Sequence, residues 1–382
     1  MYEKLLRAIN EHYGESEYAI RLFTAPGRIN LIGEHVDYLG GKVLPAAIDF
    51  KISCAVRKND LKQFRVYSFQ YNSSLCKKQL MKDPTNPWIN YILGVISELE
   101  KKGFSIGGFD MALDGNIPEG AGLSSSAALE VVVAYALAEI FQFPLDKTEI
   151  ALLAQAAENN FVGLNCGIMD QFVIAHGKAG HALILDTAKL AFEYVPFTTE
   201  GYITYLIQSN VKHSLQDSSY NHRIEECNSA LQKVQNNFPE VLDLYSLPEN
   251  FAVDSASLTG TEKKRVKHVI GERKRTDLVL QAMQEGDIPT VGECLYATHE
   301  SLANHYEVSC PETDYLVAIL KELGVLGARM IGGGFGGCIL VIESPLTAKE
   351  TQERIQLAYQ EKFALEASIY EFTTSDGVKE LA

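Results

Sequence analysis

A glycine-containing turn runs into three serines and from there into an apolar helix predicted over residues 127–141, and this segment constrains the fold most. Glycine lets the backbone approach a ligand closely, and serine is a preferred capping residue at a helix N-terminus. The unpaired N–H groups there and the positive end of the helix dipole favour an anion. The turn is therefore predicted to bind phosphate, unless it merely caps the helix. Its residues are Gly120, Ala121, Gly122, Leu123, Ser124, Ser125 and Ser126.

This turn is not a Walker loop, because the pattern Gly-x-x-x-x-Gly-Lys-Ser/Thr does not occur in the chain, and the common P-loop folds are therefore disfavoured. A second glycine-rich segment, Gly332–Gly337, formally satisfies Gly-x-Gly-x-x-Gly. A dinucleotide-binding fold needs a helix after that motif, whereas an apolar run typical of a strand follows here. We interpret the segment as a strand–loop–strand that packs its backbone close to nucleotide phosphates. A plain glycine-rich hairpin is the alternative.

Charge and cysteine usage limit the possible classes of protein. The chain has 34 basic and 49 acidic residues, a formal net charge of −15, which argues against nucleic acid or an anionic membrane as a partner. The seven cysteines are scattered and form no Cys-x-x-Cys pair, which predicts free thiols and a cytoplasmic protein. No apolar run approaches the roughly 18 residues that span a bilayer. Acidic residues within 1–21 argue against a targeting peptide.

The length of 382 residues favours two domains, which we predict over 1–190 and 191–382. Helices are expected over 1–14, 88–101, 127–141, 147–160 and 316–323, and through much of 211–302. Strands are expected over 20–32, 41–57, 64–70, 109–113, 181–186 and 202–210, and a hairpin over 328–342. This mixture indicates an α+β fold rather than a regular alternation of strands and helices.

The segment 25–38 places Arg28, Glu34, His35 and Asp37 in a loop punctuated by glycine. Carboxylates accept hydrogen bonds from vicinal hydroxyls and histidine can donate or accept, so the group suits a polyhydroxylated ligand. Each residue also has a simpler interpretation: a surface cation, two solvated loop acids and a structural histidine. A metal site is less favoured here, because no His-Glu-x-x-His spacing exists.

Two further acids are candidates for a site. Asp170 stands between Met169 and Gln171 in a segment that is otherwise apolar and contains glycine, and a partly buried carboxylate is costly unless it is paired or used. A structural acid bonded to backbone amides fits that segment equally well. Glu158 ends an alanine-rich helix, where an exposed acid is the default.

Together these segments resemble the GHMP kinase superfamily and, within it, the galactokinases. The matching segments lie in order between residues 24 and 342, at 26–38, 120–127, 166–172, 209–220 and 332–337. Residues 209–220 include Lys212, His213 and Ser214. The resemblance implies an α+β fold of two domains. The N-terminal α/β domain would be like domain 2 of ribosomal protein S5, the C-terminal domain would be ferredoxin-like, and the active site would lie in the cleft.

The resemblance also implies a role for each candidate residue. Asp170 would be the catalytic base that faces the sugar 1-hydroxyl, and Arg28 beside it would stabilise the transition state. Glu34, His35, Asp37, Gly167 and Tyr220 would bind the sugar. The serine turn would hold the ATP phosphates, with Ser68 and Trp88 near the nucleotide, although Trp88 could equally be a core residue. Ser126 and Glu158 would hold Mg²⁺.

The implied activity is the ATP-dependent phosphorylation of α-D-galactose at its 1-hydroxyl, which gives galactose 1-phosphate and ADP and begins galactose catabolism. A monomer without nucleic acid or membrane partners is expected. One residue departs from the family pattern: Ile331 stands where a threonine usually precedes the glycines. The alternatives are a binding protein that has lost catalysis, in which lesions in the phosphate turn would be expected, and a kinase for N-acetylgalactosamine or arabinose.

Overall fold

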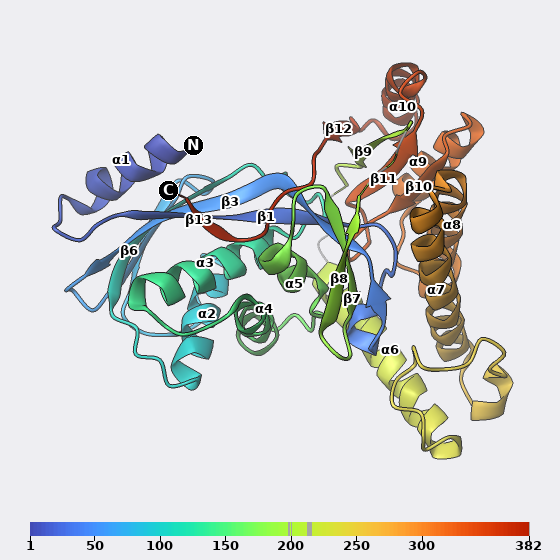
Figure 1. Ribbon diagram of the computed structural model, residues 1–382, viewed down its shortest axis with the longest axis horizontal. Coiled ribbons are helices and arrows are strands. Elements are labelled where there is room, and N and C mark those ends of the chain that lie inside the picture. Colours follow the sequence, from blue (N-terminus) through green and yellow to red (C-terminus); the bar gives the residue numbers. More distant parts are fainter. Residues whose placement is uncertain (198, 200, 212–215, 382) are drawn as a thin grey trace.

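The computed structural model describes residues 1–197, 199, 201–211 and 216–381, so Lys212, His213 and Ser214 lie outside the described residues. A mixed six-stranded sheet organises the N-terminal half (Figure 1), with the strands in the order β13-β1-β3-β6-β4-β5. These strands are β1 (Arg21–Asn30), β3 (Pro45–Asn59), β4 (Phe64–Ser68), β5 (Ser73–Lys77), β6 (Gly108–Gly115) and β13 (Lys379–Leu381).

Helices cover both faces of this sheet (Figure 1). On one face lies α1 (Tyr2–Tyr13), which packs Leu5 and Ile9 against Ala55 and Tyr67. Four helices cover the other face: α2 (Ile89–Lys101), α3 (Ser125–Phe141), α4 (Lys147–Ala156) and α5 (Met169–His176). The second of them, α3, is buried on nearly all sides, as its alanine- and valine-rich sequence requires. The serine turn therefore enters a helix at the centre of this layer.

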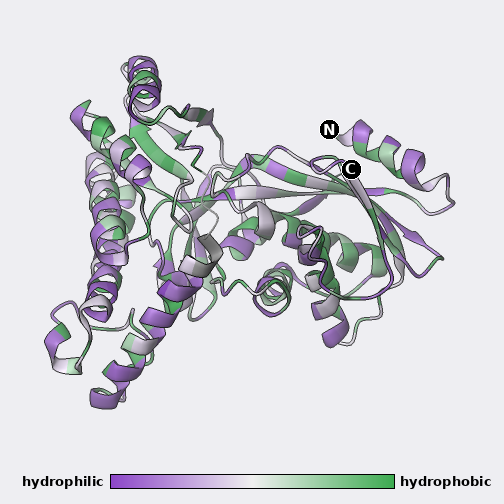
Figure 2. Ribbon diagram, turned by 180° about the vertical axis from the view of Figure 1, so that it is seen from behind, coloured by the Kyte–Doolittle hydropathy of each residue, from purple (hydrophilic) through white to green (hydrophobic). Residues whose placement is uncertain are grey.

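A four-stranded antiparallel sheet with the order β10-β11-β9-β12 organises the C-terminal half. Its strands are β9 (Ile203–Gln208), β10 (Gly327–Met330), β11 (Cys338–Glu343) and β12 (Ser368–Glu371). The central strand β11 is fully buried, and the ribbon of this sheet includes a run of hydrophobic residues that is green in Figure 2. The helices of this half are α6 (Gln216–Asn237), α7 (Gly260–Glu285), α8 (Ile288–Ser301), α9 (Pro311–Glu322) and α10 (Ala348–Phe363). This arrangement confirms the predicted α+β fold.

A small third sheet joins β2 (Lys42–Val43), β7 (His181–Asp186) and β8 (Ala191–Pro196). The chain ends near its start, because β13 pairs antiparallel with β1 between Leu22–Thr24 and Lys379–Leu381. The division into 1–190 and 191–382 stays a prediction, and it has to accommodate this return of the last strand to the first sheet.

Two local expectations were wrong. The helix predicted over 147–160 ends at Ala156, and a π-helix follows over Ala157–Val162, ending at Gly163 with φ of 98°. The serine turn does not cap its helix with a serine hydroxyl: the helix begins at Ser125, and Ser124, at the capping position, has a left-handed φ of 62° and no capping hydrogen bond. Both departures occur beside the candidate site, where wide turns and strained residues are often found.

The glycine-rich hairpin over 328–342 is confirmed, since β10 and β11 pair antiparallel on either side of the glycines. All seven cysteines are free thiols. Among the helices of the described residues, none combines the length and the apolar character that crossing a membrane requires.

Candidate active site

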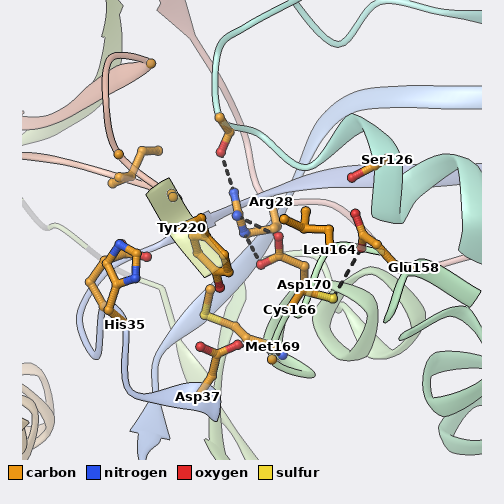
Figure 3. Close-up of a pocket in the computed structure, with 18 of the residues that line it drawn as sticks. Arg28, His35, Asp37, Ser126, Glu158, Leu164, Cys166, Met169, Asp170 and Tyr220 are labelled. Atoms are coloured by element: carbon orange, nitrogen blue, oxygen red, sulfur yellow. Dashed lines mark hydrogen bonds and ion pairs between the residues drawn. The ribbon is translucent and has the colours of Figure 1, made fainter. Parts of the chain in front are cut away.

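A cleft of about 980 Å³ brings together the segments that the sequence singled out (Figure 3). The loop after β1, the serine turn, the start of α5, α6 and the glycine-rich hairpin all contribute to its walls. Its lining includes every residue predicted to be catalytic or to bind sugar, together with Ser126 and Glu158: Arg28, Glu34, His35, Asp37, Ser126, Glu158, Gly167, Asp170 and Tyr220.

The Arg28 guanidinium and the Asp170 carboxylate form a two-point ion pair in this cleft (Figure 3). Arg28 Nε donates to Oδ1 at 2.7 Å and Nη2 donates to Oδ2 at 2.8 Å, while Nη1 donates to the Gly122 carbonyl at 2.6 Å. Burial lowers the pKa of Arg28, but the charge and hydrogen bonds of Asp170 outweigh it and raise that pKa above its ordinary value. The pair is held rigidly, with its carboxylate facing the cleft.

The serine turn lies directly against this pair. Ser124 donates its hydroxyl to Asp170 Oδ2, which explains why it does not cap α3. The whole turn from Gly120 to Ser126 lines a recess that it shares with Arg28 and Asp170. A Cβ on Gly332 would lie 2.9 Å from the Gly122 carbonyl oxygen, so the glycine hairpin packs backbone to backbone against the turn. Ile331 at the hairpin is 1 % exposed.

The loop after β1 presents Glu34 and His35 to the cleft. Glu34 is 3 % exposed and its Oε2 accepts from Arg329 Nη1 at 2.7 Å. His35 has a left-handed φ of 59°, and its Nδ1 lies 2.9 Å from the Tyr38 hydroxyl. Burial lowers the pKa of His35 to about 3, so the ring is neutral. Its buried Nε2 has no hydrogen-bond partner among the described residues, which leaves it available to a ligand.

Asp37 packs so closely on Gly167 that no side chain fits at that glycine. A Cβ built on Gly167 would lie 1.9 Å from Asp37 Oδ2. Burial, and then the negative charges of Asp170 and Glu34, raise the pKa of Asp37 to about 7. The Tyr220 ring closes this part of the cleft, with its centroid 5.6 Å from that of His35.

A second cavity, of about 840 Å³, adjoins the turn on its other side and is lined by Ser68, Trp88, Ser125 and Ser126. Tyr71 stacks on Trp88, with ring centroids 5.3 Å apart and planes within 10°. Trp88 is thus both largely buried and part of a cavity wall. An aromatic-walled space next to the turn has the character of a binding site for a flat ring system.

Glu158 lies on the π-helix and faces Ser126 across the cleft (Figure 3). It accepts from Gln171 Nε2 at 2.7 Å and from the Cys166 thiol at 3.3 Å, and burial raises its pKa to about 7. The described residues contain no group of three or more His, Cys, Asp or Glu that could hold a metal ion. Mg²⁺ prefers oxygen ligands and is often held by one or two protein groups plus phosphates, and the two oxygen-bearing side chains here fit that pattern.

Sequence reasoning missed several residues that shape the site. Gln171, next to Asp170, donates from Nε2 to Glu158 at 2.7 Å. The same Nε2 lies 3.4 Å from Oε2 of the fully buried Glu130. Glu272 and His268 of α7 contact the loop after β1. A carboxylate in a helix predicted to be buried, such as Glu130, is a signal that was present in the sequence. The contacts of α7 depend on tertiary packing and leave no sequence signal.

Three family models match the chain. Residues 10–58 match the galactokinase galactose-binding signature, residues 90–178 match the GHMP kinases N terminal domain, and residues 279–361 match the GHMP kinases C terminal domain. Residues from all three matched regions line the cleft, and the molecule is a GHMP kinase.

Full-length relatives define the family further. A galactokinase of Thermosipho africanus is 45% identical over 359 residues, which cover 94% of this chain and 99% of that protein. A galactokinase of Bacillus subtilis is 38% identical over 392 residues, covering 100% of this chain and 99% of its own. The chain therefore belongs to the galactokinase family.

Comparison with solved structures supports the same family assignment. Lactococcus lactis galactokinase complexed with galactose matches with a TM-score of 0.94 and 33% identity, and the match covers 100% of both chains. Methanococcus jannaschii mevalonate kinase matches with a TM-score of 0.64 and 18% identity over 95% of this chain and 100% of its own, and it shares the fold alone.

Proposed function

We propose that this enzyme transfers the γ-phosphoryl group of ATP to the 1-hydroxyl of α-D-galactose, giving galactose 1-phosphate and ADP. The observation that carries the proposal is the Arg28–Asp170 pair, which stands between the serine turn and the loop that bears Glu34, His35 and Asp37. A phosphate-binding turn and a hydroxyl-binding loop thus flank one carboxylate. The family relationship supports the same reaction.

In the proposed reaction the oxygen–hydrogen bond of the 1-hydroxyl breaks as a new oxygen–phosphorus bond forms, and ADP leaves in line. Asp170 orients the hydroxyl and takes up its proton. Arg28 stabilises the charge that develops on the transferred group, aided by backbone N–H groups of the turn at the N-terminus of α3. Both groups are already in place, because each is held by several hydrogen bonds.

We assign the sugar contacts to Glu34, His35, Asp37, Gly167 and Tyr220. The unpaired Nε2 of the neutral His35 ring and the partly buried carboxyl group of Asp37 supply partners for hydroxyl groups. The backbone of Gly167 keeps Asp37 in place. Buried polar groups of this kind discriminate strongly between sugars that differ in one hydroxyl, because a misdirected hydroxyl leaves the buried groups unpaired.

We assign Ser68 and Trp88 to the nucleoside of ATP, and Ser126 and Glu158 to Mg²⁺. Bound Mg²⁺ would neutralise charge on the phosphates. The Ser126 hydroxyl and the Glu158 carboxylate face one another beside the turn, and Gln171 holds the carboxylate in that orientation. We also propose a monomer that works in the cytoplasm, where ATP is available and the seven free thiols stay reduced.

A coupled assay of ADP release across galactose, glucose, N-acetylgalactosamine and arabinose tests this proposal. We expect galactose to be the preferred substrate and glucose to be essentially inactive. Faster turnover of N-acetylgalactosamine or arabinose would replace galactose as the assigned substrate. Galactose binding without any ADP release would favour a binding protein instead.

A further inference from the structure

Polar side chains of the C-terminal half form hydrogen bonds with the backbone of the loop after β1. Arg329 Nε donates to the Leu31 carbonyl at 3.0 Å, and Arg329 Nη2 donates to the Asn30 carbonyl. The amides of Gly33 and Glu34 donate to a carboxylate of α7, and a histidine of α7 donates to the Glu34 carbonyl. The segment that presents Glu34 and His35 to the cleft therefore takes its position from residues far along the chain.

Glu272 makes the central contact in this set. Its Oε1 accepts from Gly33 N at 2.9 Å and from Glu34 N at 3.0 Å, so one oxygen binds two successive amides. Gly33 has φ of +89°, and a Cβ there would lie 2.5 Å from the Lys42 carbonyl oxygen, which is why glycine occupies this turn. Consecutive amides that converge on one point form a concave anion site, and a carboxylate of the same chain fills it here.

The other oxygen of Glu272 is fixed as well. Its Oε2 accepts from Arg275 Nη2 at 2.8 Å and from Thr298 Oγ1 at 3.0 Å. Glu272 is completely buried; burial raises its pKa, but Arg275 and the other neighbouring positive groups outweigh this and lower the pKa to about 2. The side chain is thus a rigid anion, held on one oxygen by Arg275 and Thr298 and bound through the other to the two loop amides.

His268, one turn earlier on α7, adds a directed contact. Burial lowers its pKa to about 4, so the ring is neutral. The Nε2 atom of His268 lies 3.0 Å from the Glu34 carbonyl oxygen, which can only accept, so Nε2 carries the proton. The other ring nitrogen, Nδ1, therefore accepts from the Ser301 hydroxyl at 2.9 Å. The peptide groups on both sides of Glu34 are therefore bound to α7, and the side chains of Glu34 and His35 are left to face the cleft.

We propose that Glu272 is a positioning residue for sugar binding, which sets the orientation of Glu34 and His35 without touching the substrate. This inference rests on the sugar contacts assigned above. If the loop backbone rotates when the anion is removed, the polar groups of the cleft no longer meet the sugar hydroxyls together, whereas the serine turn and the Trp88 cavity keep their geometry.

The test is Glu272→Gln, which keeps the shape and removes the charge. We expect the KM for galactose to rise about ten-fold, while kcat and the KM for ATP stay within about two-fold of the wild type. The matched control is Glu262→Gln on the same helix, because Glu262 is also buried but pairs with Lys233 at 2.7 Å and caps α7. This control is expected to change Tm without changing the KM for galactose.

A second variant, Thr298→Val, keeps the volume and removes one of the bonds that orient Glu272, so it tests the inference even if Glu272→Gln does not fold. It should raise the KM for galactose by a smaller factor. An unchanged KM for galactose in the folded variants would overturn the inference, and so would an equal rise in both KM values. A wild-type enzyme that does not phosphorylate galactose would instead overturn the proposed function.

Discussion

Asp170 carries more of the proposed chemistry than any other residue, and its surroundings explain how it can. The carboxylate accepts from Arg28 Nε and Nη2 and from the Ser124 hydroxyl. These three donors fix the plane of the carboxylate. A carboxylate held in this way can orient a hydroxyl and accept its proton.

We predict that Asp170→Asn keeps the fold and lowers kcat by at least about 10²-fold, because the amide keeps the shape and cannot take up the proton. Circular dichroism and Tm check the fold, and steady-state kinetics measure the loss. The matched control is Asp83→Asn, which removes an aspartate that pairs with Lys77 at 2.6 Å, away from the cleft. A folded Asp170→Asn enzyme with near wild-type kcat would refute the assignment.

We predict that the affinity for the sugar depends on pH through Asp37. Burial and nearby negative charge raise its pKa to about 7, so it is largely protonated in the free enzyme below that pH. A sugar hydroxyl that donates to Asp37 favours the ionised form, so galactose affinity should rise from about pH 6 to about pH 8 and then level off. The raised pKa also means that this group makes the free energy of unfolding fall as pH rises between about 4 and 7.

Calorimetric titration of galactose at several pH values measures this dependence. In Asp37→Asn the inflection near pH 7 should disappear and the affinity should be low throughout. Galactose affinity in the wild type that is flat, or that falls with rising pH, would be incompatible with an anionic Asp37 in the bound state.

At the scale of elements, Glu158 lies at the start of the π-helix over Ala157–Val162, where it faces Ser126 across the cleft. Ala156 and Ala157 keep ordinary α-helical torsions, so Glu158 continues directly from α4. Gln171, at the start of α5, joins α5 to the π-helix through the 2.7 Å hydrogen bond from its Nε2 to Glu158.

We predict that Ser126→Ala and Glu158→Gln each raise the magnesium concentration needed for half-maximal activity, because each loses an oxygen ligand or its charge. Activity is titrated with MgCl₂ at fixed ATP, and magnesium binding to the enzyme with a nonhydrolysable ATP analogue is measured by calorimetry. Ser255→Ala serves as the control, since Ser255 is an exposed serine outside the lining of both cavities. Titrations that superimpose on the wild type would remove these residues from the metal site.

The start of α5 supplies a steric test. Gly167→Ala would place a Cβ 1.9 Å from Asp37 Oδ2, so Asp37 must move. We predict a rise of about ten-fold or more in the KM for galactose, because small displacements of binding groups are costly, with the KM for ATP unchanged. Gly260→Ala is the control, since a Cβ there meets nothing within 4 Å. An unchanged KM for galactose would show that Asp37 does not bind the sugar.

For the whole molecule, the sequence predicted the fold class and the segments of the cleft well. The segments 26–38, 120–126, 166–170 and 332–337 each carry a local pattern of glycine and polar residues, and the structure brings them together. Local patterns of this kind are legible because turns and helix starts depend on nearby residues.

Other elements could not be predicted, for physical reasons. The strand β8 is mostly exposed and lacks the alternation that marks a strand. The strand β13 has only three residues and depends on β1 for its pairing. The contact of Glu272 with the loop joins residues 238 positions apart, and no local pattern encodes it.

Transfer of phosphate from ATP to the anomeric oxygen of galactose leaves a product that nuclear magnetic resonance identifies. Purified enzyme is incubated with galactose, ATP and Mg²⁺, and the phosphorus and anomeric proton signals are recorded. We expect one new phosphomonoester coupled to the anomeric proton of an α-galactosyl ring, formed in step with ADP. A phosphate coupled to any other position, or ATP hydrolysis that releases only inorganic phosphate, would contradict this transfer.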